Sequence, residues 1–365
     1  MKLGMFYAKV ETPEADFRWL AGHGFDAVTT GDEPALQAEA RRQGLRPWAC
    51  LGTFNPPSDD PSMLCVDVNG DRQKWFGSGC PNHPEIRSAS LERYRRAASR
   101  EHVEGVFCDG ARFASPASGR DAFCTCFCEH CERAAGRLGL DFARMKRDVT
   151  ALCRALSSGD PPLPVEVAAS PLAVVGRLAT APGIVDWLAF RRAVITDFIG
   201  RISHVVRGSG KLFGGYLFSP CLSPLVGQDY HALAEHVDLF APMLYRNCPE
   251  RGGIAPINTE MHTIASWAHN ARDPAWVLAL VGLPGEELGR TDDLLTCGVS
   301  AEAVRIETAR ARALVGSGKS LAPIIWWDDP AIRETMAAVR RGGADGVSIF
   351  LFTERLRDLL TAPPG

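Results

Sequence analysis

FDAVTTGDEPALQAEARRQGLRPWACLG, residues 25–52, contains the repeating unit that predicts the fold. Two apolar runs, residues 25–30 and 47–52, are typical of strands that are buried on both faces. Residues 34–44, between these runs, have the pattern of a helix. A strand, a helix and a further strand in this order predict a parallel sheet.

The same alternation continues along the chain. Further strand-like runs lie at residues 2–8, 105–110, 213–218, 238–245, 276–282, 322–327 and 346–352. Helical patterns lie at residues 14–23, 84–100, 185–206, 300–315 and 330–341. About eight strand–helix units predict an α/β fold, a (β/α)8 TIM barrel, as a single domain over residues 1–365. Nine candidate strands are one too many: residues 322–327 are the extra one, unless they are a barrel strand and another assignment is wrong.

Two long segments interrupt the alternation. Residues 54–80 follow the third strand and are rich in Pro and Gly, and residues 111–183 follow the fourth strand. The second segment contains a cysteine cluster, a helix from about residue 130 to residue 156 and a Pro-rich return. Both insertions follow the C-terminal ends of strands, the face on which barrel enzymes place their active sites.

Composition excludes several classes of protein. With 46% hydrophobic and 23% charged residues, the chain is globular. The net charge of −3 gives no basic surplus for nucleic acid or an anionic membrane. No run of 18 apolar residues occurs and the N-terminal segment is unlike a signal peptide, so we expect a cytoplasmic protein.

Seven of the twelve cysteines lie between Cys65 and Cys131, which predicts a metal site rather than a disulfide framework. Cys126, Cys128 and Cys131 are close enough in sequence to bind one ion together. The fourth ligand is Cys80 or, as second choice, Cys65, and His83 or His130 could replace one sulfur. Four thiolates are typical of a closed, structural zinc site. The alternative is a group of reduced, buried thiols.

The cysteine pattern resembles that of the glycoside hydrolase family 42 β-galactosidases. The pattern consists of two stretches, CPNHPEIR, which begins at Cys80, and CFCEHCERAAGRLG, which begins at Cys126. The two cysteines are 46 residues apart. The resemblance implies that Cys80, Cys126, Cys128 and Cys131 bind zinc, and by analogy it allows a homo-oligomer. Family 42 enzymes end strand four in Asn-Glu, where this chain has Cys108-Asp109, so the zinc motif transfers better than the catalytic residues do.

Three short motifs resemble those of uncharacterised glycosyl-hydrolase-like barrels. They are DGARF from Asp109, WLAFR from Trp187 and VDLFAPMLY from Val237. With the cysteine pattern, the matches extend from Cys80 to Tyr245 and imply a glycoside hydrolase.

Asp109 is the leading catalytic candidate, because it ends a hydrophobic strand. We expect Arg112 to lower the pKa of Asp109 and keep it ionised, as a nucleophile or base requires. A glycosidase needs a second carboxylate, for which Glu33 is the first choice, then Glu287, then Asp329. The alternatives to catalytic roles are structural: an Asp109–Arg112 ion pair, and helix N-caps at Asp32, Asp328 and Asp329.

Aromatic and polar side chains at strand ends and in the loops are candidates for sugar binding. The substrate-binding candidates are Asp32, Arg112, Phe113, Tyr245, Asn247, Trp326, Trp327 and Asp329, and Trp48, Trp75 and Phe76 could also stack on a sugar ring. Core packing is the alternative for each aromatic residue.

The sequence therefore predicts a cytoplasmic glycoside hydrolase for a small or imported glycan, with a structural zinc ion. The alternatives are another hydrolase or a lyase on the same barrel, or a carbohydrate-binding barrel without catalysis.

Overall fold

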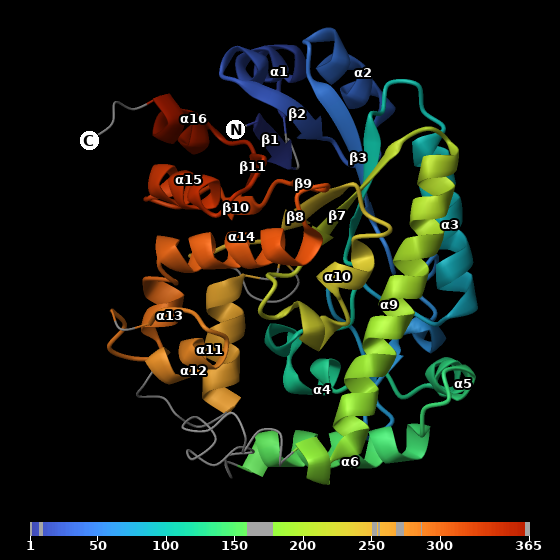
Figure 1. The fold of residues 1–365 in the computed structure, drawn as a ribbon. Helices are drawn as coiled ribbons and strands as arrows, with labels where there is room; N and C mark the ends of the chain where they lie inside the picture. Colours follow the sequence, from blue (N-terminus) through green and yellow to red (C-terminus); the bar gives the residue numbers. More distant parts are fainter. Residues whose placement is uncertain are drawn as a thin grey trace.

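The protein has a mixed α/β fold built on a curled, all-parallel sheet with helices on its outer side (Figure 1). The computed structural model describes residues 2–6, 10–158, 178–249, 254, 256–267, 274–285 and 287–361. Nine strands are hydrogen-bonded in the order β10-β11-β1-β2-β3-β6-β7-β8-β9. Their bounds are β1 (Lys2–Phe6), β2 (Phe25–Thr29), β3 (Arg46–Gly52), β6 (Gly105–Asp109), β7 (Leu212–Leu217), β8 (Leu239–Pro242), β9 (Ser320–Leu321), β10 (Ile324–Trp326) and β11 (Gly346–Phe350).

The two ends of this sheet are neighbouring parts of one segment, residues 320–326. β9 pairs with β8, whereas β10 pairs with β11. Leu244 N donates to Ile324 O and Ser348 N donates to Pro323 O, each at 2.8 Å. The segment is thus hydrogen-bonded on both sides, and residues 322–327 do contain a strand of the main sheet.

Helices follow the strands along the chain and pack outside the sheet. They are α1 (Pro13–Gly22), α2 (Pro34–Arg42), α3 (Pro84–Ala98), α9 (Pro182–Gly208), α10 (Tyr230–Leu233), α14 (Ala301–Val315), α15 (Ile332–Arg341) and α16 (Glu354–Thr361). Three further helices, α11 (Ile257–Trp267), α12 (Pro274–Leu280) and α13 (Asp293–Thr296), lie between β8 and α14.

The predicted strand at residues 276–282 is wrong, because most of this run belongs to helix α12. Pro274 starts the helix, where its fixed φ and missing N–H are tolerated. Gly282, with a φ of 69°, follows the last turn and stops the helix. A short apolar run has no period that distinguishes a buried strand from a buried helix.

The side chains of β6 show how the sheet divides the interior. Phe107 stacks on Tyr216 of β7 at 4.2 Å and packs on Trp48 of β3 at 4.8 Å, inside the curled sheet. Val106 and Cys108 instead belong to a core cluster shared with α9. Alternation along the strand therefore turns Asp109 to the same inner side as Phe107.

The segments after β3 and β6 are long. The first contains η1 (Pro61–Met63) and a hairpin of β4 (Cys65–Val66) and β5 (Arg72–Gln73). The second contains η2 (Pro116–Ser118), α4 (Arg120–Phe123), α5 (Glu129–Arg137) and α6 (Phe142–Ser158). The helix predicted over residues 130–156 is thus two helices, separated around Gly139 with its φ of 69°.

Arg191 of α9 attaches the second segment to the body of the protein. Its buried guanidinium donates to Phe123 O and also, at 2.7 Å each, to Thr125 O and Leu225 O. The group lies 3.8 Å from the ring centre of Trp187. Burial lowers the pKa of Arg191 to about 9. Within the part of the chain that the structure describes, no helix is long and apolar enough to span a membrane.

Candidate functional site

Asp109 lies at the C-terminal end of β6, opposite Gly52 of β3. Its side chain faces the inside of the sheet and the residue is 8% exposed. The carboxylate accepts a hydrogen bond of 2.7 Å from the N–H of Gly110, whose φ of 61° turns the chain away. Asp109 therefore combines limited access with a single short backbone contact, which suits a group that exchanges a proton with a ligand.

Burial raises the pKa of Asp109, and this outweighs the lowering by the Gly110 N–H and the charge of Arg112. The net shift is opposite to the one expected from the sequence. Desolvation disfavours a carboxylate more strongly here than one arginine favours it. Asp109 is thus displaced toward the protonated form.

Arg112 is buried between aromatic rings rather than exposed at a rim. Its guanidinium carbon lies 4.6 Å from the ring centres of both Trp75 and Phe218. Burial lowers the pKa of Arg112 to about 10, while Glu260 and Asp109 oppose that shift. The positive charge of Arg112 therefore acts on two buried carboxylates, Asp109 and Glu260.

Glu260 of α11 is a buried carboxylate that the sequence reasoning missed. It is 1% exposed, and burial raises its pKa. Ala117 N donates to its Oε2 at 2.9 Å, and the Ser115 hydroxyl also hydrogen-bonds to the carboxylate. Glu260 therefore attaches η2 to α11 and counters the charge of Arg112. A glutamate within a helix has no local signal in the sequence.

An aromatic group, made of Tyr245, Trp326 and Phe350, lies at the C-terminal ends of the strands. Tyr245 is buried, and both burial and the Asp109 carboxylate raise its pKa. Its ring meets Trp326 edge-on at 5.8 Å, and Trp326 stacks on Phe350 at 5.4 Å. Asp109, Tyr245 and Trp326 thus lie at the same end of the sheet. Trp327 is half-buried and packs on Trp326 at 6.1 Å.

Phe76 is the exposed aromatic residue beside this group. It is 43% exposed and lies 5.9 Å from the Arg112 guanidinium carbon. A Cβ at Gly110 would meet its ring at 3.5 Å. Its φ of 44° is unusual for a residue with a large side chain, and such strain is often found at functional sites.

The favoured partner carboxylates lie elsewhere. Glu33 precedes α2 as an exposed N-cap residue without a side-chain cap hydrogen bond. Asp32 is ion-paired with Arg100 at 2.5 Å. Glu287 is exposed, in a turn that follows a helix rather than a strand. No contact of the described residues joins any of these three to Asp109.

Asp329 is fully occupied by structural contacts. Arg246 donates to both of its oxygens, at 2.6 and 2.7 Å. Thr335 and the Ala331 N–H, just before α15, also donate to it. These bonds leave its oxygens little capacity for a substrate.

Two further substrate-binding candidates lie in different surroundings. Phe113 is completely buried and packs on Phe190 of α9 at 6.2 Å. Asn247 is half-buried, beside Gly298. Trp48 lies at the beginning of β3, so its ring is far along the strand from the C-terminal end where Asp109 lies.

Cys80, Cys126, Cys128 and Cys131 lie together, as predicted, and could hold a metal ion. Their sulfur atoms all lie within 4.8 Å of one another. The Sγ of Cys80 is 3.5 Å from those of Cys128 and Cys131 and 3.8 Å from that of Cys126. A tetrahedral zinc ion with Zn–S bonds of about 2.3 Å requires sulfur separations of roughly 3.8 Å. The donor set and the spacing therefore fit one ion.

Backbone and amide N–H groups surround these sulfurs. Val66 N donates to Cys126 Sγ at 3.3 Å, and Asn82 donates from its backbone to Cys80 and from its side chain to Cys131. Such hydrogen bonds stabilise thiolates and orient metal ligands. The four cysteines connect the segment after β3 with the segment after β6.

The sequence matches no protein-family model and no curated protein. The resemblance to glycoside hydrolase family 42 therefore stays a prediction.

Several solved structures are similar to the chain at low levels. An exo-β-N-acetylglucosaminidase from Vibrio harveyi is 7% identical, with a TM-score of 0.46, over 98% of this chain and 53% of its own. A 3-keto-D-glucoside 4-epimerase from E. coli is 12% identical, with a TM-score of 0.41, over 99% and 100%. The spore cortex-lytic enzyme of Bacillus megaterium is 9% identical, with a TM-score of 0.33, over 73% of this chain and 47% of its own. This chain thus spans about half the length of the spore enzyme. At these TM-scores the similarities do not indicate an activity.

Proposed function

We propose that the protein is a glycoside hydrolase for a small or imported glycan, in which Asp109 supplies the proton to the leaving group. The observation that carries the proposal is the placement of Asp109 at the C-terminal end of a buried strand, with its pKa raised by burial. A raised pKa increases the fraction of the carboxyl group that carries a proton, and the protonated form is the one that a general acid requires. The proposed location is the cytoplasm.

The surrounding side chains have proposed roles in binding. Phe76 offers an exposed ring face on which the apolar side of a sugar could stack. Tyr245 and Trp326 would contact the sugar from the inner side of the sheet. Arg112 and Glu260 are positioning residues, because they are held by aromatic rings and by η2 and adjust the charge around Asp109.

One observation favours a second candidate function. Glycosidases use two carboxylates, separated by about 5 Å or by about 6.5–9.5 Å. Glu33 and Glu287 are exposed, and Glu260 is engaged with η2. A lyase or isomerase that moves a proton with Asp109 alone needs no such partner, and is therefore the alternative.

The fold and the metal have corresponding proposals. Counting β9 and β10 as one strand gives eight strand–helix units, and we propose a complete (β/α)8 TIM barrel with insertions at residues 54–80 and 111–183. We also propose that the ion held by Cys80, Cys126, Cys128 and Cys131 is zinc. With all four positions occupied by sulfur, a bound zinc would stabilise the insertions and leave no open site for substrate.

The decisive experiment compares aryl glycosides that have good and poor leaving groups, in the wild type and in Asp109→Asn. A general acid matters most for a poor leaving group. We expect Asp109→Asn to slow the hydrolysis of phenyl glycosides by about 10²–10⁴-fold and to slow the hydrolysis of dinitrophenyl glycosides far less. Equal losses on both would assign Asp109 a nucleophilic role, and unchanged turnover would remove it from the reaction.

The two functions are separated by running the reaction with candidate sugars in deuterated water. Incorporation of deuterium at a sugar carbon without hydrolysis would support the proton-transferring alternative. Glu33→Gln and Glu287→Gln serve as matched controls, because both side chains are exposed and no contact of the described residues joins them to Asp109. A large loss of turnover in either variant would identify the second carboxylate.

A further inference from the structure

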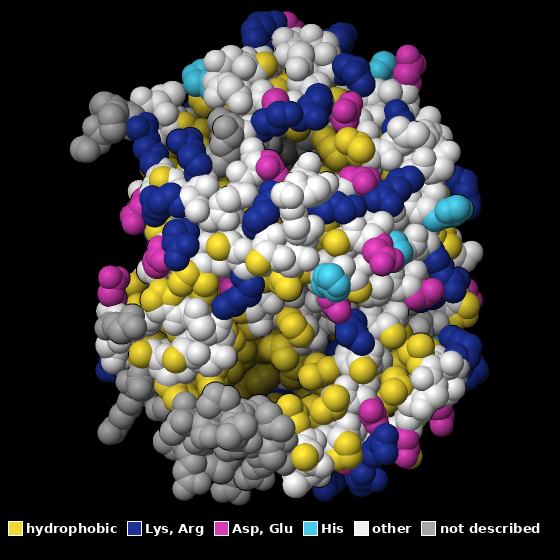
Figure 2. Space-filling model, in the orientation of Figure 1, with side chains coloured by type: hydrophobic (Ala, Val, Ile, Leu, Met, Phe, Trp, Pro, Cys, Tyr) yellow, Lys and Arg dark blue, Asp and Glu magenta, His cyan; other side chains and the backbone are white. Residues whose placement is uncertain are grey.

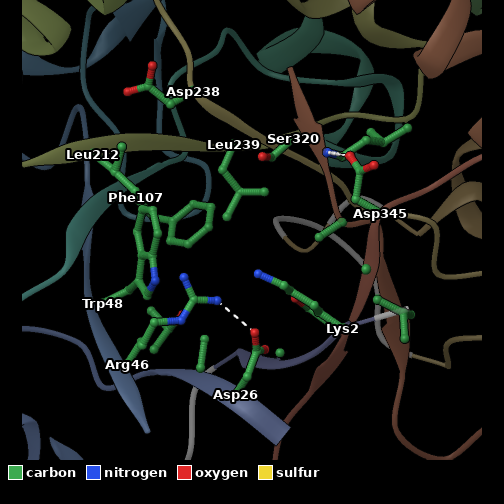
Figure 3. A pocket seen from close by; sticks show the side chains of 18 of the residues that line it. Lys2, Asp26, Arg46, Trp48, Phe107, Leu212, Asp238, Leu239, Ser320 and Asp345 are labelled. Atoms are coloured by element: carbon green, nitrogen blue, oxygen red, sulfur yellow. Dashed lines mark hydrogen bonds and ion pairs between the residues drawn. The ribbon is translucent and has the colours of Figure 1, made fainter. Parts of the chain in front are cut away.

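A cavity of about 260 Å³ opens at the end of the sheet opposite Asp109. Its lining comes from the first residues of the strands, among them Lys2 of β1, Arg46 of β3 and Leu212 of β7 (Figure 3). Figure 2 shows dark-blue and magenta side chains around a dark opening in the upper half of that face. None of the expected catalytic residues lines this cavity.

The cavity exists because the strands around it carry small residues on their inner side. Gly4, Ala27, Ala322 and Ser348 all belong to the lining. Barrel interiors are ordinarily filled by layers of bulky side chains. Residues of this size leave open a space that larger side chains would close.

One wall of the cavity is aromatic. Trp48, Phe107 and Tyr216 come from adjacent strands and contact one another in series. Figure 3 shows the rings of Trp48 and Phe107 side by side along one edge of the space. The hydroxyl of Tyr216 is 2.8 Å from Thr29 Oγ1, so that hydroxyl already has a partner. This wall offers a flat surface with few free polar atoms, as an aromatic ring prefers.

Of the charged side chains at the rim of the cavity, the acids are all paired with arginines, and Lys2 is a further cation. Each of the three acids has its own arginine: Asp26 pairs with Arg46 at 2.7 Å, Asp238 with Arg207 at 2.6 Å, and Asp345 with Arg312 at 2.6 Å. Among the ion pairs of the described residues, none involves Lys2. In Figure 3 the Lys2 side chain extends toward the middle of the cavity.

We propose that this cavity is a second binding site, for a small aromatic monocarboxylate whose ring packs on Trp48 and Phe107 and whose carboxylate pairs with Lys2. The size agrees with this class of ligand, because a cavity of about 150 Å³ is sufficient for benzene alone. The proposal is independent of the reaction at Asp109, since the two sites lie at opposite ends of the strands.

Isothermal titration calorimetry at low ionic strength tests the site with three probes. Benzoate carries the ring and the charge, benzyl alcohol carries the ring alone, and glucuronate carries the charge on a sugar ring. We expect benzoate to bind about tenfold more tightly than either of the other two. Tighter binding of glucuronate, or no binding of benzoate, would overturn the assignment.

Three variants locate the bound probe. Lys2→Met removes the unpaired cation and should weaken benzoate about tenfold, while affecting benzyl alcohol little. Ala27→Leu fills the cavity and should abolish binding of both. Asp109→Asn changes only the other end of the sheet and should leave binding unchanged. Thermal unfolding of each variant verifies that it is folded. Benzoate binding that survives Lys2→Met and Ala27→Leu, or that is lost in Asp109→Asn, would contradict the proposal.

Discussion

Asp109 and Arg112 show how burial changes the chemistry of single residues. Burial raises the pKa of the acid and lowers the pKa of the base, so the charged form of each is disfavoured. Phe76 shows a different effect, because its backbone has a positive φ while its ring remains exposed. All three residues lie in or beside the proposed site, where departures from ordinary residue behaviour are most often functional.

The raised pKa of Asp109 makes stability depend on pH. A carboxyl group whose folded pKa exceeds the unfolded value stabilises the fold when protonated, so its contribution is lost as pH rises through the folded pKa. We expect Asp109→Asn to unfold at a higher temperature than the wild type at pH 7. The difference should disappear toward pH 3, below the ordinary pKa of 3.8. Melting curves across this range measure it, and a constant difference would show that ionisation of Asp109 has no energetic cost.

Removing Arg112 should change the pH dependence of turnover. The charge of Arg112 lowers the pKa of Asp109, so Arg112→Met should raise that pKa further. The limb of the pH–rate profile that reports Asp109 should then move to higher pH. A downward movement would show that another group controls this limb. Thermal unfolding of Arg112→Met separates this effect from misfolding.

Phe76→Gly tests the exposed ring without loss of the fold. Glycine relieves the strain of a positive φ but also makes the unfolded chain more flexible, so we expect the free energy of unfolding to change by no more than about 1 kcal/mol. The ring's contact with substrate would be lost, which should raise KM more than it lowers kcat. A large loss of stability would instead identify Phe76 as a packing residue.

Two elements hold the insertions over the body of the protein. The four cysteines connect residues near β4 to the beginning of α5, and Arg191 of α9 binds the carbonyls that follow α4. The insertions therefore depend on polar contacts in addition to a hydrophobic core, and a metal ion bound by the four cysteines would add to these contacts. Structural metal sites of this kind contribute folding free energy directly.

Cys80→Ser should remove the metal and destabilise the protein, because three thiolates bind zinc much less tightly than four. Cys65→Ser is the matched control, since Cys65 is equally buried but lies outside the set of four. Metal analysis should give about one ion per chain in the wild type and in Cys65→Ser, and far less in Cys80→Ser. Equal metal content in all three would contradict the assignment.

Arg191→Met should destabilise the protein by about 3 kcal/mol or more, because several buried carbonyls lose their donor. The neighbouring Arg192→Met is the control. Arg192 is exposed, and its loss should cost no more than about 0.5 kcal/mol. Chemical denaturation measures both, and similar values would show that Arg191 is not a structural anchor.

At the scale of the whole molecule, the two ends of the curled sheet lie in one short segment, residues 320–326. Residues 320–326 donate and accept hydrogen bonds on both sides, toward β8 and toward β11. If these bonds close the sheet into the proposed barrel, the sheet has no free edge. The amides of Leu244 and Ser348 should therefore exchange with solvent as slowly, within about tenfold, as those of β6. Hydrogen exchange measures this, and fast exchange at both would indicate an open seam.

The sequence predicts much of the sheet because parallel strands that are buried on both faces are nearly continuous apolar runs, as in β6. It fails at residues 276–282, where helix α12 is equally apolar. Asp109 can be found from its position at the end of a strand. Glu33 and Glu287 cannot be excluded in this way, because position does not reveal where a side chain points. Neither Glu260 nor the pKa of Asp109 is predictable, since both depend on burial by distant segments.

The aromatic series inside the sheet links residues on neighbouring strands. The ring of Trp48 lies where a Cβ at Gly105 would come within 2.3 Å, and the ring of Phe107 lies 2.4 Å from a Cβ at Gly214. Each large side chain thus requires that its neighbour have none. Among homologues, positions 107 and 214 should vary as a pair: a chain that has lost the ring at position 107 could acquire a methyl group at position 214, but not one that retains it. Coupled substitutions of this kind would show that the packing of these side chains is maintained during evolution.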